Sequence, residues 1–297
     1  MVDYDEFGML ADNAAEVGLA FEPPAVRRTS VTGPSGYELS ALVWGESEPE
    51  LVLLHGGAQN AHTWDTVALA LDRPLVAIDL PGHGHSAWRA DRDYRPQAMA
   101  DDVLSAIGQL APQATTLVGM SLGGLTALAA LAGDPGAADR LVLVDVTPGV
   151  DRNKAAAIVN FVAGPTEFES FDVLLARTIE HNPTRSESSL RRGVLHNAHE
   201  RDDGSWVWNY DRLGDDLGDM ADFESRFGDL WEAVSAIQAP MLLARGALSP
   251  VVDDADVAEL RRRQPTVEVV TIEGAGHSIQ GDQPLELASL IDRFHRG

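Results

Sequence analysis

Short apolar runs alternate with longer amphipathic stretches over most of the chain, and this alternation predicts its architecture. Apolar runs of four or five residues have the character of buried strands, and they occupy residues 51–54, 75–78, 114–118, 141–144, 241–244 and 267–271. Stretches with apolar positions at helical spacing occupy residues 62–71, 96–110, 122–132, 253–263 and 284–294. Strands that alternate with helices are typical of a mostly parallel sheet covered by helices on both faces, so we predict an α/β fold.

The N-terminal part of the chain follows a different pattern. Residues 4–19 place apolar side chains at helical spacing and acidic side chains on the other face, which predicts an amphipathic helix that ends before Pro23-Pro24. Residues 26–32 and 37–44 are predicted strands around the turn signal Gly33-Pro34-Ser35-Gly36. We therefore expect residues 1–22 to form a helix packed on the core, and the sheet to begin with a hairpin.

The alternation of strands and helices stops after Pro148 and resumes near residue 241. Between these points, residues 151–234 hold helical stretches at 154–162, 171–181 and 186–199, no clear strand, and the aromatic group Trp206-Val207-Trp208. We therefore predict a core made of residues 23–150 and 235–297, into which residues 151–234 are inserted as a helical cap.

One serine lies at the point where a predicted strand meets a predicted helix. Gly119-x-Ser121-x-Gly123 has the spacing of a nucleophile elbow, a sharp turn that lifts a serine hydroxyl clear of the sheet. Its glycines let the strand and the following helix approach more closely than a Cβ would allow. The N-terminus of that helix directs N–H groups toward an anion that forms on the substrate. The pattern predicts that Ser121 is a nucleophile.

A serine nucleophile needs a base and donors for the oxyanion. His277 follows the last predicted strand in the segment Gly274-Ala275-Gly276-His277, which can bring an imidazole over the carboxyl edge of the sheet. One oxyanion donor is the amide of the residue after the nucleophile, Leu122, and the second comes from the loop after the first buried strand. In that loop Gly57 is the best-placed donor, with Ala58 as the alternative.

The acid that would orient His277 has two candidate positions. Asp145 ends the strand after the elbow helix, and Asp253 or Asp254 follows the strand after the inserted segment. Ser249 stands in that second loop where an acid is wanted, and a serine cannot stabilise an imidazolium by charge. Asp253 and Asp254 precede a predicted helix, where capping is their ordinary role. We favour Asp145 and keep the two later aspartates as alternatives.

Three further histidines stand in loops after predicted strands. His55 precedes Gly56-Gly57, and His83 and His85 belong to the segment Pro81-Gly82-His83-Gly84-His85-Ser86. We expect them to hold these loops by hydrogen bonds. A metal site formed by the three is disfavoured, because no helical His-x-x-x-His pair and no cysteine partner accompany them.

Composition and charge limit the classes of function. The 297 residues are 44% hydrophobic and 23% charged, which is enough for a sizeable core. The formal net charge is −24, from 22 basic and 46 acidic residues, and it argues against nucleic acid and anionic membranes as partners. The absence of cysteine excludes disulfides, thiolate zinc sites and a cysteine nucleophile.

The sequence carries no signal for a membrane or for secretion. Residues 1–6 are acidic and lack an apolar signal core, and no apolar run approaches the ~20 residues of a membrane span. We expect a soluble, cytoplasmic protein that acts on a small molecule and needs no cofactor, since no phosphate-binding Gly-x-x-x-x-Gly-Lys loop occurs. The oligomeric state is left open, with a homodimer as one option.

Four segments together resemble the α/β-hydrolase fold superfamily, in its branch with a serine nucleophile and a helical cap. The segments that carry the likeness are His55-Gly56-Gly57, Asp79-Leu80-Pro81-Gly82-His83-Gly84-His85-Ser86, Gly119-Met120-Ser121-Leu122-Gly123-Gly124 and Gly274-Ala275-Gly276-His277. The likeness spans residues 26–150 and 237–297. It implies a catalytic triad with Ser121 as nucleophile and His277 as base, and an oxyanion hole formed by Gly57 and Leu122.

The same likeness informs the choice of acid and of reaction. Many members carry the acid as Gly-x-x-Asp, where this chain has Gly246-Ala247-Leu248-Ser249. Other members carry it one strand earlier, at the position of Asp145. Members that act as epoxide hydrolases or haloalkane dehalogenases use an aspartate nucleophile, so the serine at position 121 argues against both of these reactions.

The predicted cap would cover the catalytic edge and set the choice of substrate. Its candidate lining residues are Phe161, His196, Trp206 and Trp208, with Phe168 as a further aromatic candidate. Packing within the cap is the alternative role for each aromatic side chain. If several of them face the serine, the pocket is apolar and suits a neutral ester or lactone with a hydrophobic part.

The main hypothesis is hydrolysis of a carboxylic ester through an acyl-enzyme on Ser121, with His277 as base and Asp145 as orienting acid. A second hypothesis keeps these residues but cleaves a carbon–carbon bond of a diketone-type ring-cleavage product, whose anionic group would need Arg191 or Arg192. An acyltransferase is a variant of the first. A ligand-binding receptor or scaffold on the same fold is the non-enzymatic alternative.

Overall fold

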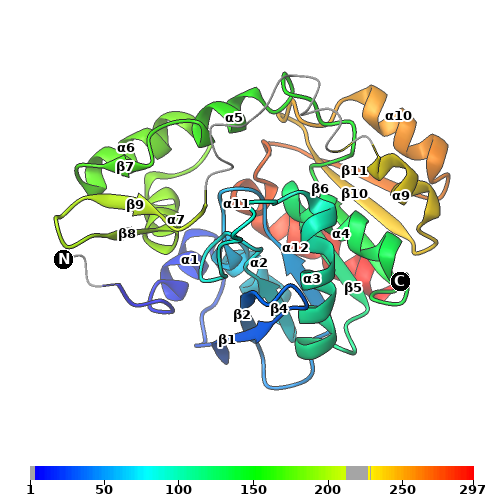
Figure 1. The fold of residues 1–297 in the computed structure, drawn as a ribbon, viewed down its shortest axis with the longest axis horizontal. Helices are drawn as coiled ribbons and strands as arrows, with labels where there is room; N and C mark the ends of the chain where they lie inside the picture. Colours follow the sequence, from blue (N-terminus) through cyan, green and yellow to red (C-terminus); the bar gives the residue numbers. More distant parts are fainter. Residues whose placement is uncertain (1–3, 212–226, 228) are drawn as a thin grey trace.

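The computed structural model of the chain describes residues 4–211, 227 and 229–297. Its centre is an eight-stranded sheet with the order β1-β2-β4-β3-β5-β6-β10-β11. These strands are β1 (Val26–Thr32), β2 (Glu38–Trp44), β3 (Leu51–Leu54), β4 (Leu75–Ile78), β5 (Thr116–Met120), β6 (Arg140–Val144), β10 (Met241–Gly246) and β11 (Glu268–Ile272). β1 and β2 form the predicted antiparallel hairpin, β2 pairs antiparallel with β4, and all pairs from β4 to β11 are parallel. The predicted α/β architecture is confirmed (Figure 1).

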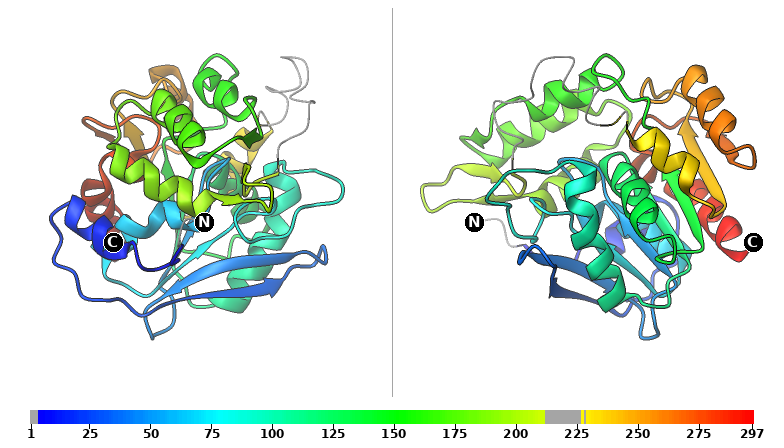
Figure 2. Two further views of the ribbon diagram at one scale, coloured as in Figure 1. Left: turned by 90° about the vertical axis from the view of Figure 1, so that its left-hand side faces the viewer. Right: turned by 45° about the vertical axis from the view of Figure 1, so that its right-hand side comes forward.

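Helices cover both faces of this sheet (Figures 1 and 2). They are α1 (Leu10–Glu16), the 3₁₀ turn η1 (Ala61–Trp64), α2 (Asp65–Leu71), α3 (Pro96–Leu110), α4 (Leu122–Gly133), α9 (Leu230–Ala236), α10 (Asp254–Arg263), α11 (Ile279–Asp282) and α12 (Pro284–Arg296). Val52 and Leu54 of β3 join the hydrophobic cluster under α3, α4 and α10, whereas Leu51 and Leu53 join the cluster under α2 and α12. Because both of its faces are buried, β3 is apolar throughout.

A second layer lies over one end of the core (Figure 1). Its elements are α5 (Ala156–Val162), β7 (Glu167–Phe168), α6 (Phe171–His181), α7 (Glu187–Asn197), β8 (Ala198–Glu200) and β9 (Trp206–Trp208). These elements enclose a separate hydrophobic cluster that includes Leu174, Leu190 and Trp206. We call residues 151–211 the inserted segment.

The sequence shows no clear strand in residues 151–234, but the structure has three short ones there, so the expectation of a purely helical cap is wrong. β7, β9 and β8 form a three-stranded antiparallel sheet. Between β8 and β9 the chain reverses through Gly204, which has a φ of 85°, and the Arg201 amide donates to the Ser205 carbonyl across the turn. The aromatic and β-branched residues of β9 suit a strand. Strands of two or three residues, however, are too short to produce a recognisable alternation.

At its C-terminal end, the predicted cap includes residues that pack with the core. Leu230 and Val234 of α9 belong to the hydrophobic cluster of the core, together with residues of α3 and α4. This part of the predicted range 151–234 therefore packs with the core. Residues 212–226 and 228 of the same range lie outside the described part of the chain.

The N-terminal helix is shorter than predicted. α1 spans only Leu10–Glu16: residues 6–9 form turns before it, and Gly18 adopts the left-handed backbone conformation, with a φ of 73°, just beyond its end. Leu10 packs in the cluster under α2 and α12, as expected for a helix that rests on the core. Asn13 also accepts a hydrogen bond of 2.6 Å from Arg192 of α7, so α1 contacts the inserted segment as well.

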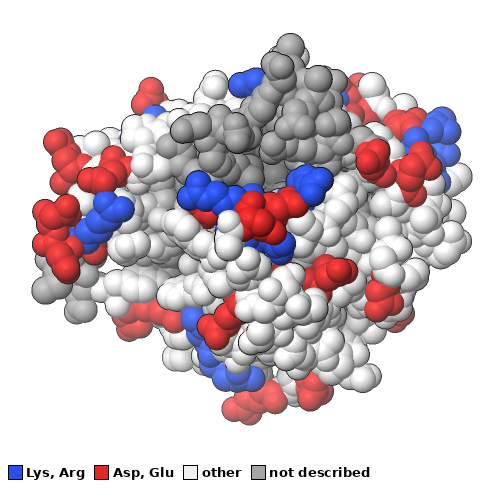
Figure 3. All heavy atoms as spheres, in the orientation of Figure 1, with Lys and Arg blue, Asp and Glu red and all other residues white. Residues whose placement is uncertain are grey.

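Acidic side chains are spread over the face of the molecule drawn in Figure 3, and the basic ones lie in small groups beside them. This distribution agrees with the formal net charge of −24. Among the helices that the structure describes, none is both long and apolar enough to cross a membrane.

Candidate active site

Ser121 stands on a strained turn between β5 and α4. Its backbone has a φ of 51° and a ψ of −120°, a region that residues other than glycine avoid. The Ser121 amide donates to the Val144 carbonyl at 3.2 Å, and the amides of Gly124 and Leu125 donate to the Ser121 carbonyl. The strand–turn–helix context that the sequence pattern predicts is therefore present at this serine.

The glycines around Ser121 are required by close backbone contacts. A Cβ on Gly119 would lie 2.5 Å from the Gly123 carbonyl oxygen. A Cβ on Gly123 would lie 2.4 Å from the Leu54 carbonyl oxygen. Both neighbours are backbone atoms, which cannot move aside without disturbing a strand or a helix. Strands β3 and β5 and helix α4 therefore fit together only with glycine at these two positions.

His277 and Asp145 are joined by a hydrogen bond. Nδ1 of His277 lies 2.8 Å from Oδ2 of Asp145, whose side chain is fully buried just after β6. Oδ1 of Asp145 accepts from the Gly246 amide at 2.9 Å, and Oδ2 also accepts from the Ser249 hydroxyl. Because Nδ1 of His277 must donate to the carboxylate, its Nε2 is left free to accept a proton.

The other two candidate acids have different partners. The Asp253 side chain caps α10 by accepting from the Asp256 amide at 2.9 Å, and the Asp256 side chain accepts from the Asp253 amide in return. Asp254 forms an ion pair of 2.6 Å with Arg245. Of the three aspartates considered, the structure brings Asp145 to the histidine and uses the other two elsewhere.

Ser121 and His277 line one cavity of about 520 Å³, which the inserted segment also lines. Within the described residues, the His277 ring has a hydrogen bond to Asp145 and none to the Ser121 hydroxyl. Bonds between a serine and its base are often long in the absence of substrate and shorten in the complex. The arrangement thus places both groups at one cavity wall without joining them directly.

Gly57 and Leu122 lie side by side next to Ser121. A Cβ on Gly57 would have Leu122 Cδ2 at 3.9 Å, and a Cβ on Gly56 would lie 3.2 Å from the Ser121 Cβ. Leu122 is the first residue of α4, so its amide has no acceptor one turn back within the helix. Ala58, the alternative donor, has a positive φ of 59°. The loop after β3 and the start of α4 thus bring two backbone segments to the serine.

His55 and His83 hold loops, as predicted. His55 is fully buried, its Nδ1 donates to the Gly56 carbonyl at 2.7 Å, and its Nε2 accepts from the Leu80 amide at 2.9 Å. Nδ1 of His83 donates to the Pro81 carbonyl at 3.0 Å. Burial lowers the pKa of His55 to about 3 and also lowers the pKa of His83, so both imidazoles are neutral at physiological pH.

Three of the four residues predicted to line the pocket do so, namely Phe161, His196 and Trp208. Trp206 does not, because its ring packs edge-on against Phe171 inside the inserted segment, with 5.0 Å between ring centres. Phe168 likewise packs edge-on against Trp208, at 5.8 Å. For Trp206 and Phe168 the alternative role, packing within the inserted segment, is the correct one.

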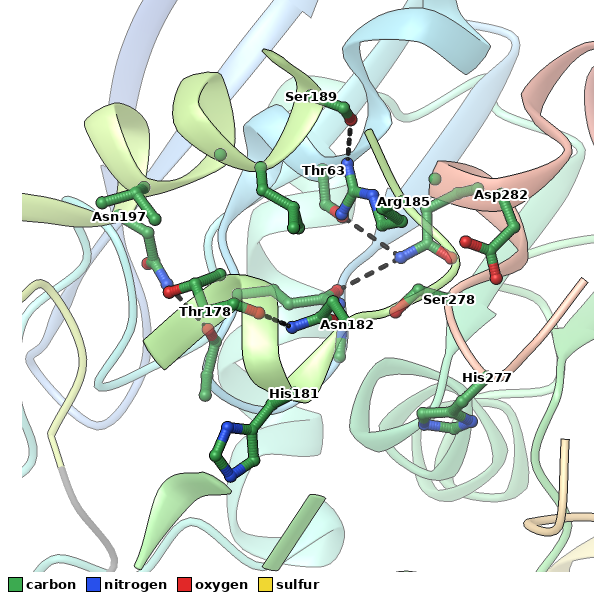
Figure 4. Close-up of a pocket in the computed structure, with 18 of the residues that line it drawn as sticks. Thr63, Thr178, His181, Asn182, Arg185, Ser189, Asn197, His277, Ser278 and Asp282 are labelled. Atoms are coloured by element: carbon green, nitrogen blue, oxygen red, sulfur yellow. Dashed lines mark hydrogen bonds between the residues drawn. The ribbon is translucent and has the colours of Figure 1, made fainter. Parts of the chain in front are cut away.

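The remaining wall of the cavity is polar, which the sequence analysis missed (Figure 4). Its side chains come from the loop before α7, from α7, from α11 and from the turn η1, and they include Thr63, Asn182, Arg185, Ser189, Asn197, Ser278 and Asp282. A signal existed in the polar run 181–189. Sequence spacing alone, however, does not indicate that this run turns toward the serine.

The two arginines that the sequence offered for an anionic substrate are both engaged. Arg192 lines the cavity, but its guanidinium donates to Asn13 and to Glu16. Arg191 is exposed, and its guanidinium carbon lies 4.7 Å from the centre of the Phe171 ring. Neither residue presents a free cation toward Ser121.

The strand order, the helical layers and the serine on the turn after β5 place this chain in one class of proteins, the α/β hydrolases. The model of the Alpha/beta hydrolase family matches residues 51–290, and the chain belongs to that family. The resemblance drawn from the sequence motifs is confirmed.

Two characterised relatives and one solved structure illustrate the match. The chain is 45% identical to the esterase Rv0045c of Mycobacterium tuberculosis over 294 residues, which are 97% of this chain and 94% of that protein. It is 30% identical to a 3-hydroxybutyrate-oligomer hydrolase of Cupriavidus necator, over 89% of this chain and 95% of that one. A structure of the M. tuberculosis esterase, solved in connection with its inhibition by transition metals, covers both chains fully at 44% identity with a TM-score of 0.88.

Proposed function

We propose that this protein is a serine esterase, which hydrolyses a carboxylic ester through an acyl-enzyme on Ser121. The observation that carries the proposal is the position of Ser121 on a strained turn, in the wall of a cavity that His277, paired with Asp145, also lines. The identity of 45% with an esterase over 97% of the chain supports the same reaction.

In the proposed reaction the Ser121 oxygen attacks the ester carbonyl carbon while Nε2 of His277 takes the hydroxyl proton. The carbonyl electron pair moves onto oxygen, where the amides of Gly57 and Leu122 donate hydrogen bonds to the oxyanion. When the tetrahedral intermediate collapses, the bond to the alcohol oxygen breaks and His277 gives the proton to that oxygen. A water molecule activated by the same imidazole then cleaves the acyl-enzyme.

Asp145 has two tasks in this mechanism. Its hydrogen bond to Nδ1 of His277 keeps the proton on that nitrogen, so that Nε2 can act as the base. Its negative charge stabilises the imidazolium that forms in the transition state. The hydrogen bonds from Gly246 and Ser249 hold the carboxylate in the orientation that both tasks need.

The apolar part of the cavity wall supports a substrate with a hydrophobic acyl or alcohol part. Its side chains come from α5, α7 and β9 and are Ile158, Phe161, Val162, Leu190, Val194 and Trp208. We infer that the inserted segment acts as a cap that excludes water and favours neutral esters or lactones.

A cytoplasmic location, a homodimer and the lack of a cofactor stay predictions from the sequence.

Carbon–carbon hydrolysis of an anionic diketone stays the second candidate, because one guanidinium at the cavity has no carboxylate within ion-pair distance among the described residues. Arg185 donates to the Ser189 hydroxyl at 2.5 Å, and its buried Nε has no hydrogen-bond partner in that part of the chain. Burial lowers the pKa of Arg185, although the charges of Asp282 and Glu16 act in the opposite direction. The anion of such a substrate would give this cation a partner.

Turnover of p-nitrophenyl esters with acyl chains of increasing length tests the proposal, with wild type and Ser121→Ala compared side by side. Turnover that depends on the serine and rises with chain length is the expected result. A phosphonate probe that labels Ser121 covalently checks the nucleophile independently of the acyl group. Full ester turnover by Ser121→Ala would refute the proposal, and serine-dependent cleavage of diketones without cleavage of esters would favour the second candidate.

A further inference from the structure

Three buried side chains that the proposed hydrolysis does not use converge where the core meets the inserted segment. His62 belongs to η1, Asp65 is the first residue of α2, and His196 lies in the last turn of α7. Their exposed fractions are 7%, 2% and 5%. Each offers one ring nitrogen or carboxylate oxygen, and these atoms lie within 4.8 Å of one another. Within the described residues, this is the only such group of three potential metal ligands.

Both imidazoles are held from behind, as the imidazoles of metal-binding histidines usually are. Nε2 of His62 lies 3.1 Å from Oε1 of Glu6, and Nδ1 of His196 lies 2.8 Å from the Tyr4 hydroxyl. Such an outer partner fixes the ring and directs its other nitrogen toward the ion. In His62 the other nitrogen is Nδ1, which lies 2.9 Å from Oδ2 of Asp65. In His196 it is Nε2, which lies 3.8 Å from the same oxygen.

Two buried atoms of this cluster lack a hydrogen-bond partner among the described residues. They are Nε2 of His196 and Oδ1 of Asp65. Buried polar atoms are nearly always paired in native proteins, because an unpaired one loses its hydration without compensation. Two such atoms in one small cluster therefore point to a missing ligand that both could contact, and a cation can serve a ring nitrogen and a carboxylate oxygen at once.

The charges around the cluster suit a divalent cation. Three carboxylates lie at the cluster, those of Glu6, Asp65 and Asp79. The guanidinium of Arg28 donates hydrogen bonds to Glu6 and to Asp79. With neutral imidazoles this set has a net charge of minus two. A divalent cation would balance that charge.

We propose that Nδ1 of His62, an Asp65 carboxylate oxygen and Nε2 of His196 bind a divalent transition metal ion, such as Zn²⁺ or Co²⁺. Imidazoles with a carboxylate are the donors that these ions prefer, whereas Ca²⁺ and Mg²⁺ prefer oxygen donors. The two rings are stacked, with centres 3.8 Å apart and an angle of 10° between their planes, so both rings must rotate before their nitrogens face one ion. Both histidines line the cavity, which gives the ion access to the site.

The site would connect two parts of the fold. His62 and Asp65 belong to the core, whereas His196 belongs to α7 of the inserted segment. An ion that binds only the folded protein stabilises it by mass action. We therefore expect metal binding to raise the unfolding temperature and to hold α7 against α2. This inference does not depend on the proposed ester hydrolysis.

Titration of the chelator-stripped full chain with Co²⁺ and Zn²⁺ tests the site. One equivalent of Co²⁺ is expected to give the visible absorption of an ion with a nitrogen and oxygen donor set, and Zn²⁺ is expected to displace it and to raise the unfolding temperature. His196→Gln and Asp65→Asn each remove one ligand while keeping a similar size. We expect both variants to bind Co²⁺ about tenfold more weakly, or weaker still.

His199→Gln is the matched control, because His199 is an exposed histidine of β8 that contacts Asn209. This variant should bind Co²⁺ like wild type, and so should His277→Gln, which removes the histidine of the candidate active site. Tyr4→Phe removes the hydrogen-bond partner of His196 but no proposed ligand, so it provides a second test if a ligand variant fails to fold. We expect it to bind Co²⁺ about tenfold more weakly than wild type. Absence of Co²⁺ binding by wild type, or equal binding by wild type and His196→Gln, would overturn the proposal.

Discussion

Ser249 donates a hydrogen bond to Asp145, the carboxylate that also accepts from Nδ1 of His277. Ser249 stands in the loop position where many α/β hydrolases carry the acid itself. In this chain the proposed acid, Asp145, follows β6, which pairs with β10 in the sheet, so the loops after both strands meet at the same carboxylate. The serine at the more usual position therefore holds the carboxylate that we propose as the acid.

Asp145→Asn is expected to lower kcat by about 10³–10⁴-fold with little change in KM. The amide keeps the shape of the carboxylate but lacks the charge that stabilises the imidazolium, and it can favour the wrong tautomer of His277. Steady-state kinetics with any ester that wild type cleaves measure both parameters.

Asp253→Ala is the matched control for that substitution. Asp253 caps α10, so its loss should lower stability by about 1 kcal/mol and leave kcat close to that of wild type. A larger loss of kcat in Asp253→Ala than in Asp145→Asn would assign the acid to the loop before α10.

Ser249→Ala removes one of the three hydrogen bonds to the Asp145 carboxylate and leaves those from Gly246 and His277. We expect kcat to fall about tenfold, which corresponds to about 1.4 kcal/mol of lost transition-state stabilisation, with KM unchanged. Ser249→Thr keeps the hydroxyl and should recover most of the activity. An unchanged kcat in Ser249→Ala would mean that the other two hydrogen bonds suffice to hold the carboxylate.

The parallel part of the sheet could be predicted from the sequence because fully buried strands leave continuous apolar runs. The bounds of β3 (Leu51–Leu54) and β4 (Leu75–Ile78) coincide with the predicted ranges. The strands β7, β8 and β9 could not be predicted, because each has only two or three residues. Such short elements are stabilised by tertiary contacts, which leave no local pattern.

In the candidate site, too, one part could be predicted from the sequence and another part could not. Ser121, His277 and Asp145 each follow a predictable strand, and the carboxyl ends of parallel strands meet at one edge. The cavity wall was harder to predict. Trp206 and Trp208 are two residues apart on β9 and share a face of the strand, yet only Trp208 reaches the cavity. Trp206 packs against Phe171 instead, and such packing is a property of the folded chain.

Gly123→Ala tests the close packing of the elbow. The new Cβ would lie 2.4 Å from the Leu54 carbonyl oxygen, so we expect a loss of several kcal/mol in the free energy of unfolding and little soluble protein. Gly108→Ala is the matched control, because Gly108 lies within α3 and an added Cβ meets no atom within 4 Å. That variant should be more stable by about 0.5–1 kcal/mol. Equal urea midpoints for Gly123→Ala and wild type would contradict the packing described.

His55 links the stability of this protein to pH. Burial, together with the nearby His83, lowers the pKa of His55 from the ordinary value of 6.5 to about 3 in the folded state. Between these two pH values the unfolded chain binds a proton at His55 that the folded protein does not bind. The free energy of unfolding therefore falls as the pH falls below 6.5, by about 1.4 kcal/mol per pH unit for this one residue.

Urea unfolding at about pH 7.5 and pH 5.0 measures this contribution, and His55→Asn isolates it. The amide of that variant can still donate to the Gly56 carbonyl, as Nδ1 of His55 does, but it cannot take up a proton. His55→Asn should be less stable than wild type at the higher pH, yet it should lose about 2 kcal/mol less on acidification. Groups that titrate in this range without interacting with His55 affect both proteins equally and cancel in the comparison. If wild type and His55→Asn lost equal stability, His55 would have to be protonated in the folded state, which its two hydrogen bonds to the backbone forbid.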